Sequence, residues 1–381
     1  MNYPLDRFAG LQTPFYYYDL QLLRRTLSEV KAHLLPNYHV HDAVKACATP
    51  AVLREICRAG LGCDCVSGGE IQAALDAGFP ADRIVYAGVG KSDREINLAL
   101  EAGIQCFNVE SLPELDIINE LALAKGTVAR IAFRINPNVG AHTHANITTG
   151  LAENKFGIDM QDMLPAIRHA QTLKGVELVG LHFHIGSQIL EMNDFQALCG
   201  RINDLQDTLE GEGIHLRSIN VGGGLGVDYE HPDEHPVPNF RDYFATYQRG
   251  LELRPNQEVH FELGRAIVAQ CGSLITRVLY VKSNAIKRFA IVDAGMTDLI
   301  RPALYGALHR IVNLSAPDAE QVTYDVVGPI CESSDVFARD YSLPALRRGD
   351  LVALQTAGAY GQIMASGYNC RPLPAAVTSE D

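Results

Sequence analysis

The stretch HVHDAVKACATPAVLREICRAGLGCDCVSGGEIQAALDAG, residues 39–78, contains the pattern that decides the fold. Its strand-like run HVHDAVKA (39–46) precedes a helical pattern, TPAVLREICRAG (49–60), with a candidate threonine N-cap and a terminal glycine. The same order repeats at once, with strand-like CDCVS (63–67) before helical GGEIQAALDAG (68–78). Such alternation is typical of parallel strands joined by right-handed crossovers.

Strand-like runs continue to alternate with helical patterns as far as about residue 270. Six more such runs are RIVYAG (83–88), QCFNVE (105–110), RIAFRIN (130–136), VGLHFHIG (179–186), SINVGGG (218–224) and EVHFELG (258–264). The eight units together equal the number in a closed (β/α)8 barrel, and an open doubly wound sheet is the competing architecture. We expect a TIM-type (β/α)8 barrel over residues 22–270.

The pattern changes after about residue 270, where β-rich runs are separated by glycine, proline and charged turns. The clearest runs are CGSLITRVLYVKS (271–283), RFAIVDAG (288–295), TYDVVGPICES (323–333) and DLVALQTAGAYG (350–361). Few long helical patterns lie between them, which indicates a second, mainly antiparallel β domain. The early run TPFYYYD (13–19) is also strand-like, so we expect residues 1–21 and 271–381 to form this domain together.

The composition of the chain argues against several classes of binding partner. The 381-residue chain is 47% hydrophobic and carries a formal net charge of -13, which argues against nucleic-acid or anionic-membrane partners. Its N-terminal stretch shows no apolar signal-like core, and no apolar run could span a bilayer. The nine cysteines are scattered without zinc-site spacing. We therefore expect a cytoplasmic protein with reduced thiols and no metal site.

Lys45 is the first candidate for chemistry, because it lies near the end of the first predicted barrel strand. Active sites of such barrels form at the carboxyl ends of the strands. A lysine in an apolar strand is unusual, and a desolvated one can act as a Schiff-base amine. The alternative is a lysine that extends from the strand end into water.

Three further strand ends carry polar or glycine-rich groups. HFHIGSQ (182–188) offers His184 to stack on a planar ring and Ser187 to bind a phosphate, while His182 reads better as a core histidine. VGGGLG (221–226) could bring backbone N–H groups to a phosphate, or could be a tight turn. In ELGR (262–265), Glu262 could pair with a protonated ring nitrogen and Arg265 with an anion, or the two could form an ordinary ion pair.

The predicted β domain also contains polar, glycine-rich segments typical of ligand-site loops, although surface turns are the alternative. Their candidate residues are Arg301, Tyr305, Cys331, Glu332 and Tyr360.

These segments together resemble the fold-type III pyridoxal-phosphate decarboxylases, and among them the diaminopimelate decarboxylases. The similarity extends from FYYYD (15–19) to YNCRPLP (368–374). The motifs that carry it occur in the family's order: CDCVSGGEI, AGVGKSDREI, CFNVES, RINPNVGAHTHANITTGLAENKFGI, HFHIGSQI, GGGLGVDY, DAGMTDLIRPALY, CESSD and GAYG. The resemblance implies an alanine-racemase-like barrel plus β domain, pyridoxal 5'-phosphate as cofactor, and conversion of meso-diaminopimelate to L-lysine and carbon dioxide. It also implies a homodimer whose active sites use both chains.

The resemblance assigns roles residue by residue. Lys45 is similar to the Schiff-base lysine, and Cys331, supplied by the partner subunit, to the proton donor. The implied cofactor-binding residues are Lys45, Asp64, His184, Ser187, Gly224, Glu262, Gly264, Arg265 and Tyr360. The implied substrate-binding residues are Arg265, Arg301, Tyr305, Glu332 and Tyr360.

The sequence departs from the family's pattern around the lysine, at Asp42, Cys47 and Thr49, and at Leu263, where the family has proline. A charged Asp42 close to Lys45 would favour the protonated amine and oppose cofactor attachment.

Three alternatives therefore stay open. The first is a related decarboxylase acting on ornithine, lysine, carboxynorspermidine or a carrier-bound amino acid, although Arg301 and CESSD argue against simple diamine precursors. The second is a racemase of related fold, and the third is a non-catalytic homologue that still binds the cofactor.

Overall fold

The structure is a computed structural model that describes residues 1, 3–137 and 155–381. Residues 138–154, which hold most of the motif RINPNVGAHTHANITTGLAENKFGI, lie outside the described residues. Contacts divide the chain into two units, and the larger comprises residues 27–226 and 239–264. The other comprises residues 1–26, 227–238 and 265–381. The predicted domain limits, 22–270 for the barrel and 1–21 with 271–381 for the β domain, stay a prediction.

The larger unit is a closed barrel of parallel strands in the order β5-β4-β3-β2-β10-β9-β8-β6, completed by pairing of β5 with β6. The strands are β2 (Tyr38–Ala43), β3 (Gly62–Cys65), β4 (Ile84–Tyr86), β5 (Cys106–Val109), β6 (Ala129–Asn136), β8 (Val176–His182), β9 (Ser218–Asn220) and β10 (Glu258–Leu263). The two-residue strand β7 (Ile158–Asp159) adds to β6. The barrel is confirmed and the open sheet is excluded, because all eight predicted runs form strands of one closed sheet.

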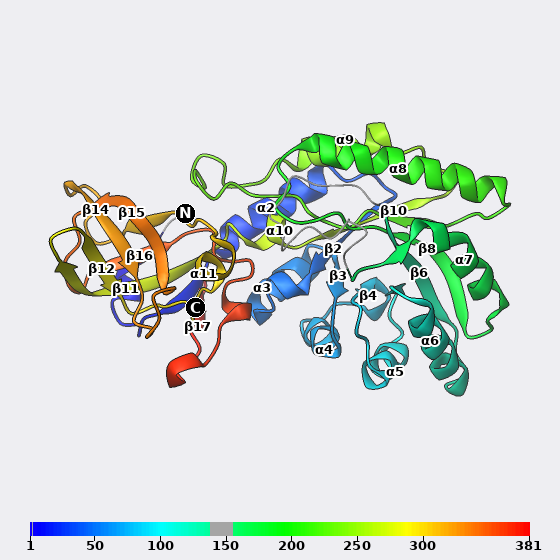
Figure 1. Ribbon diagram of the computed structural model, residues 1–381, viewed down its shortest axis with the longest axis horizontal. Coiled ribbons are helices and arrows are strands. Elements are labelled where there is room, and N and C mark those ends of the chain that lie inside the picture. The colour runs from blue at the N-terminus through cyan, green and yellow to red at the C-terminus, as the bar shows by residue number, and fades with distance from the viewer. Residues whose placement is uncertain (2, 138–154) are drawn as a thin grey trace. The chain divides into compact units, whose positions relative to one another are not determined.

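Helices follow most of the barrel strands and lie outside them (Figure 1). Their bounds are α3 (Pro50–Arg58), α4 (Gly68–Asp76), α5 (Asp93–Ala102), α6 (Leu112–Ala124), α7 (Met163–Thr172), α8 (Met192–Gly211) and α9 (Phe240–Gly250), while α2 (Leu20–Ala32) precedes the first barrel strand. Among the helices described, none is both long enough and apolar enough to cross a membrane.

The packing of β10 shows which side chains face the barrel interior. Phe261 packs on Tyr243, Phe244 and Tyr247 of α9, with ring centroids 5.0 to 5.9 Å apart, so it points outward. Successive strand residues point to opposite faces. Glu262, the next residue, therefore points into the barrel.

Near Lys45 the predicted strand end is wrong, whereas the predicted N-cap residue is confirmed. β2 ends at Ala43, and Lys45 lies in a 3-10 turn, Val44–Ala46, rather than in the strand. Thr49 does occupy the N-cap of α3, but its side chain makes no capping bond. Its hydroxyl instead accepts a hydrogen bond from the Cys47 thiol at 3.4 Å. Pro50 at the first helical position suits the helix start, because its missing N–H would have no partner there.

The other unit is built on an eight-stranded, mainly antiparallel sheet in the order β13-β16-β11-β12-β14-β15, in which β1 also pairs with β11 and β17 pairs with β1. Its strands are β1 (Phe15–Tyr18), β11 (Gly272–Ser283), β12 (Arg288–Val292), β13 (Ile311–Asn313), β14 (Gln321–Val327), β15 (Val336–Pro344), β16 (Leu351–Leu354) and β17 (Ala375–Thr378). It also holds the short helices α1 (Leu5–Phe8), α10 (Arg265–Val268) and α11 (Arg301–Tyr305). The N-terminal strand pairs with β11, as the strand-like run TPFYYYD predicted (Figure 1).

Candidate active site

Lys45 and Asp64 form the first pair of the site. The Lys45 Nζ lies 3.8 Å from Asp64 Oδ2, and the lysine side chain is 40% exposed. Asp64 is buried. Burial raises the pKa of Asp64 well above its usual range, and the charge of Glu262 adds to this effect, while Lys45 opposes it.

Asp42 has different surroundings. It follows His41, whose ring bonds His260 at 2.9 Å, and strand alternation points Asp42 to the opposite, helix-covered face of the barrel. Asp42 is fully buried, and neither carboxyl oxygen has a hydrogen-bond partner among the described residues. Burial raises the pKa of Asp42 well above its usual range, and nearby Glu70 adds to this. A protonated Asp42 places no negative charge beside Lys45, which removes the sequence-based objection to that lysine.

Leu263, the other departure, is the last residue of β10 and is buried. Its Cα partner across the sheet is Asp42, so both altered residues lie on the same outward-facing layer.

Glu262 is held by side chains from three other strands. Its Oε1 accepts hydrogen bonds from the Nδ2 of Asn108 at 3.0 Å and of Asn220 at 2.7 Å. Its Oε2 lies 2.9 Å from His182 Nε2, which must donate because an ionised carboxylate only accepts. Burial alone would raise the pKa of Glu262, but His182 and Lys45 outweigh it and hold that pKa well below its usual range. The interior thus separates two carboxyls, with Glu262 ionised and the pKa of Asp64 raised.

His184 lies just beyond the end of β8, beside the glycine turn that follows β9. Its Nδ1 accepts a hydrogen bond from the backbone N–H of Gly223 at 3.3 Å. Burial lowers the pKa of His184 well below its usual range, and Arg134 and Lys45 act in the same direction. A neutral, flat imidazole is suited to stacking on another ring. Ser187 follows three residues later and is partly buried.

The turn Gly222–Gly224 requires glycine for steric reasons. A Cβ at Gly223 would lie 1.9 Å from the Glu262 backbone oxygen, and one at Gly222 would lie 2.3 Å from the Phe183 oxygen. Gly224 has a φ of 108°, which favours glycine. Within the described part of the chain, the Gly224 N–H has no hydrogen-bond acceptor. A free backbone N–H in a glycine turn is the group that binds a phosphate oxygen.

The β-sheet unit contains a cluster of arginines and tyrosines. Arg265, the first residue of α10, donates to the Tyr229 hydroxyl at 2.6 Å and lies over the ring of Tyr360 at 4.9 Å. Arg301, at the start of α11, lies over the ring of Tyr229, with its guanidinium carbon 4.8 Å from the ring centroid. Tyr305 ends the same helix and is partly buried. Two closely spaced guanidinium groups in a buried cluster are suited to binding carboxylates.

His309 orients Arg301. The Nδ1–H of His309 donates to the Gln355 carbonyl at 2.9 Å, so its Nε2 is the acceptor that faces Arg301 Nη1, also at 2.9 Å. Burial lowers the pKa of His309 to about 3, and Arg301 contributes to this effect. A neutral histidine can therefore hold the guanidinium without adding charge.

Cys331 and Glu332 lie on an exposed surface of the same unit. Glu332 accepts hydrogen bonds from the Tyr368 hydroxyl at 2.7 Å and the Ser334 hydroxyl at 3.0 Å, which lower its pKa. The backbone N–H of Cys331 donates to Asn369 Oδ1 at 3.3 Å. Their described hydrogen bonds are thus with this surface, not with Arg265 or Arg301.

The sequence interpretation missed several residues that bind the candidate ones: Asn108, Asn220, Tyr229 and His309. It read His182 as a core histidine, and the structure buries that residue but bonds it to Glu262. Of these residues only His309 lay outside the quoted runs, since Asn108 is in CFNVES, Asn220 in SINVGGG, His182 in HFHIGSQ and Tyr229 in GGGLGVDY. The runs did not reveal the role of the two asparagines, because their shared partner Glu262 is 154 residues from Asn108 and 42 from Asn220 in the chain. His309 lies only eight residues after Arg301, but just beyond the quoted motif DAGMTDLIRPALY.

Comparisons with known proteins show which family has this fold and these residues. A family model described as the pyridoxal-binding domain of pyridoxal-dependent decarboxylases matches residues 20–269. The diaminopimelate decarboxylase of Bacteroides thetaiotaomicron is 63% identical over 381 residues, which cover all of this chain and 98% of that protein. The chain belongs to the pyridoxal-dependent decarboxylase family.

Solved structures of this decarboxylase family share the fold. Diaminopimelate decarboxylase from Helicobacter pylori complexed with L-lysine superposes with a TM-score of 0.93 at 42% identity, covering 98% of this chain and 93% of that one. The Aquifex aeolicus diaminopimelate decarboxylase is 40% identical over 369 residues, covering 97% of this chain and 87% of that protein.

The family's cofactor, pyridoxal phosphate, fits the barrel residues chemically. A primary amine at Lys45, an ionised carboxylate at Glu262 and a neutral ring at His184 correspond to the aldehyde, the pyridine nitrogen and the ring face of the cofactor. The Gly224 N–H, for which the described residues offer no acceptor, is suited to its phosphate.

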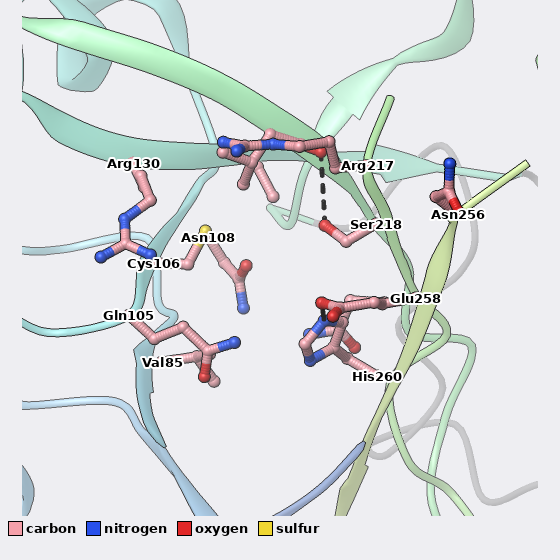
Figure 2. A pocket seen from close by; sticks show the side chains of 13 residues that line it. Val85, Gln105, Cys106, Asn108, Arg130, Arg217, Ser218, Asn256, Glu258 and His260 are labelled. Carbon is pink, nitrogen blue, oxygen red and sulfur yellow. Dashed lines mark hydrogen bonds and ion pairs between the residues drawn. The ribbon is translucent and has the colours of Figure 1, made fainter. Parts of the chain in front are cut away.

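A cavity of about 240 Å³ lies inside the barrel near the amino ends of its strands (Figure 2). Asn108 and Asn220, which hold Glu262, line it together with Arg130, Glu258 and His260. Lys45 and His184 are not among its lining residues, so this cavity is separate from the residues expected to hold the cofactor.

Proposed function

We propose that this chain converts meso-diaminopimelate to L-lysine and carbon dioxide, the last step of lysine biosynthesis, with pyridoxal 5'-phosphate as cofactor. One observation carries the cofactor chemistry: a buried Glu262 that three donors keep ionised, in the same barrel as the Lys45–Asp64 pair. The choice of substrate is supported by the relatives named above, which are diaminopimelate decarboxylases. This chain matches them over 98% and 87% of their lengths.

Bound pyridoxal phosphate would supply an electron sink for the carbanion that remains after loss of carbon dioxide. Lys45 would hold the cofactor through Nζ and exchange places with the substrate amine. Glu262 would keep the ring nitrogen protonated by accepting its hydrogen bond, which strengthens the sink. We assign the phosphate to Ser187, Gly224, Gly264 and Arg265, and the ring face to His184, with Asp64 and Tyr360 as further cofactor contacts.

The substrate's far end bears both a carboxylate and an ammonium group, and the proposed substrate residues match these charges. We assign Arg301 to the distal carboxylate, supported by its fixed geometry against His309, and Glu332 to the ammonium. Arg265, Tyr305 and Tyr360 complete the substrate-binding set. An amino acid without the distal carboxylate would leave Arg301 unpaired, which is costly in a desolvated site and favours diaminopimelate over ornithine or lysine.

Protonation of the α-carbon requires an acid, and we assign this role to the Cys331 thiol. Exposure of Cys331 and Glu332 on their own unit supports a further proposal, that they serve the site of a partner subunit in a homodimer. We place the enzyme in the cytoplasm, since its cysteines are free thiols, which is typical of a reducing compartment.

The deciding experiment measures carbon dioxide and lysine released from meso-diaminopimelate by cofactor-loaded protein. Lys45→Ala is the control and is expected to abolish release. Chiral analysis of the remaining substrate tests the racemase alternative, and ornithine and lysine serve as competing substrates. If the wild-type protein binds the cofactor but releases no lysine, the diaminopimelate assignment is wrong.

A further inference from the structure

The hydrogen bonds of Glu262 are distributed unequally between its two oxygens. Oε1 accepts from two amides, Asn108 and Asn220, and so uses both of its lone-pair positions. Oε2 accepts one bond, from His182 Nε2 at 2.9 Å. One lone pair, on Oε2, is therefore left for a ligand, and the His182 ring fixes the direction of this oxygen.

His182 itself is held with little freedom. It is 1% exposed at the end of β8, and its other ring nitrogen, Nδ1, has no hydrogen-bond partner among the described residues. A buried ring nitrogen without a partner costs free energy, and the Glu262 bond is the polar interaction that offsets this cost. A histidine that served only to fill the core would be expected to have both ring nitrogens hydrogen-bonded, so this arrangement points to a role toward Glu262.

We propose that His182 is a positioning residue for Glu262: its Nε2–H holds Oε2 so that the carboxylate stays ionised and presents one lone pair to the ring nitrogen of bound pyridoxal phosphate. A donor on a carboxylate lowers its basicity. The shared proton then resides on the ring nitrogen rather than on Glu262. Without the donor, Glu262 becomes the stronger base and draws the proton toward itself, which weakens the electron sink. The inference rests on the proposed function only for the identity of the cofactor.

The test uses protein loaded with pyridoxal phosphate labelled with 15N in the ring, measured without substrate. The 15N chemical shift reports directly whether the ring nitrogen carries a proton, and a pH series gives the midpoint of its titration. His182→Phe, which removes the donor but keeps a flat ring, should lower this midpoint by about one to two pH units, the equivalent of one hydrogen bond to a charged group. His182→Gln, which keeps an N–H donor, should restore much of the wild-type midpoint.

His260→Phe is the matched control, because His260 is also a buried barrel histidine but bonds His41 rather than Glu262. It should leave the 15N titration unchanged. His182→Leu replaces His182→Phe if the larger ring prevents folding, and should lower the midpoint in the same way. The proposal is overturned if both donor-free variants keep the wild-type titration, or if His260→Phe shifts it equally. Failure of lysine production from diaminopimelate would instead contradict the substrate assignment, since the 15N measurement involves no substrate.

Discussion

Asp42 should lower the free energy of unfolding as the pH rises, because its carboxyl is buried without a hydrogen-bond partner among the described residues. The structure gives neither oxygen a hydrogen bond among the described residues, and burial raises the pKa of Asp42 well above the 3.8 of a free aspartate. Between those two pKa values the folded chain binds a proton that the unfolded chain releases. The contribution of Asp42 to stability is therefore fully present below about pH 3.8 and declines by about 1.4 kcal/mol per pH unit above it, until the folded-state pKa is reached.

Two isosteric variants test this reasoning. Asp42→Leu removes both the titration and the unpaired polar atoms, whereas Asp42→Asn removes only the titration and leaves a buried amide that costs about 1–3 kcal/mol. Free energies of unfolding in urea, measured at several pH values from 5 to 8, should show Asp42→Leu gaining on the wild type as the pH rises. Asp42→Asn should follow the same slope at lower stability. A difference between wild type and Asp42→Leu that does not change with pH would refute a protonated, buried Asp42.

Three further predictions concern the candidate site. Gly223→Ala should destabilise the protein by about 1–3 kcal/mol in a thermal unfolding assay, because the added Cβ would lie 1.9 Å from the Glu262 backbone oxygen. Gly200→Ala on α8 is the control and should be neutral or stabilising, because a Cβ there would lie in open space. His309→Phe should raise the KM for diaminopimelate about 5- to 10-fold by releasing Arg301, with cofactor affinity unchanged; an unaltered KM would contradict the role of His309. Glu262→Gln should lower kcat by about 100-fold or more while the protein stays folded, as steady-state kinetics with circular dichroism would show.

The eight strand positions and the barrel could be predicted because each strand–helix unit is local in sequence. Capping residues, glycines and apolar runs act within about ten residues of one another, so the order HVHDAVKA, TPAVLREICRAG and CDCVS already carries the information. The same reasoning failed at Lys45, which lies in a 3-10 turn instead of the strand. A strand end depends on where the neighbouring strands stop, and the local pattern does not contain this.

The sequence by itself was enough to predict the candidate residues: Lys45, His184 and Glu262 stand out as polar groups at the ends of apolar runs, whatever their neighbours. Only the tertiary structure decided the charge state of His184 and Glu262. Asn108 is 154 residues away from Glu262 in the chain, and His182 is 80 residues away from it. Their hydrogen bonds to Glu262 therefore form only when the barrel has closed. The face on which Asp42 lies was settled in the same way, because alternation along a strand gives opposite faces without saying which one is inside. Burial and distant partners set a pKa, and both are properties of the folded chain.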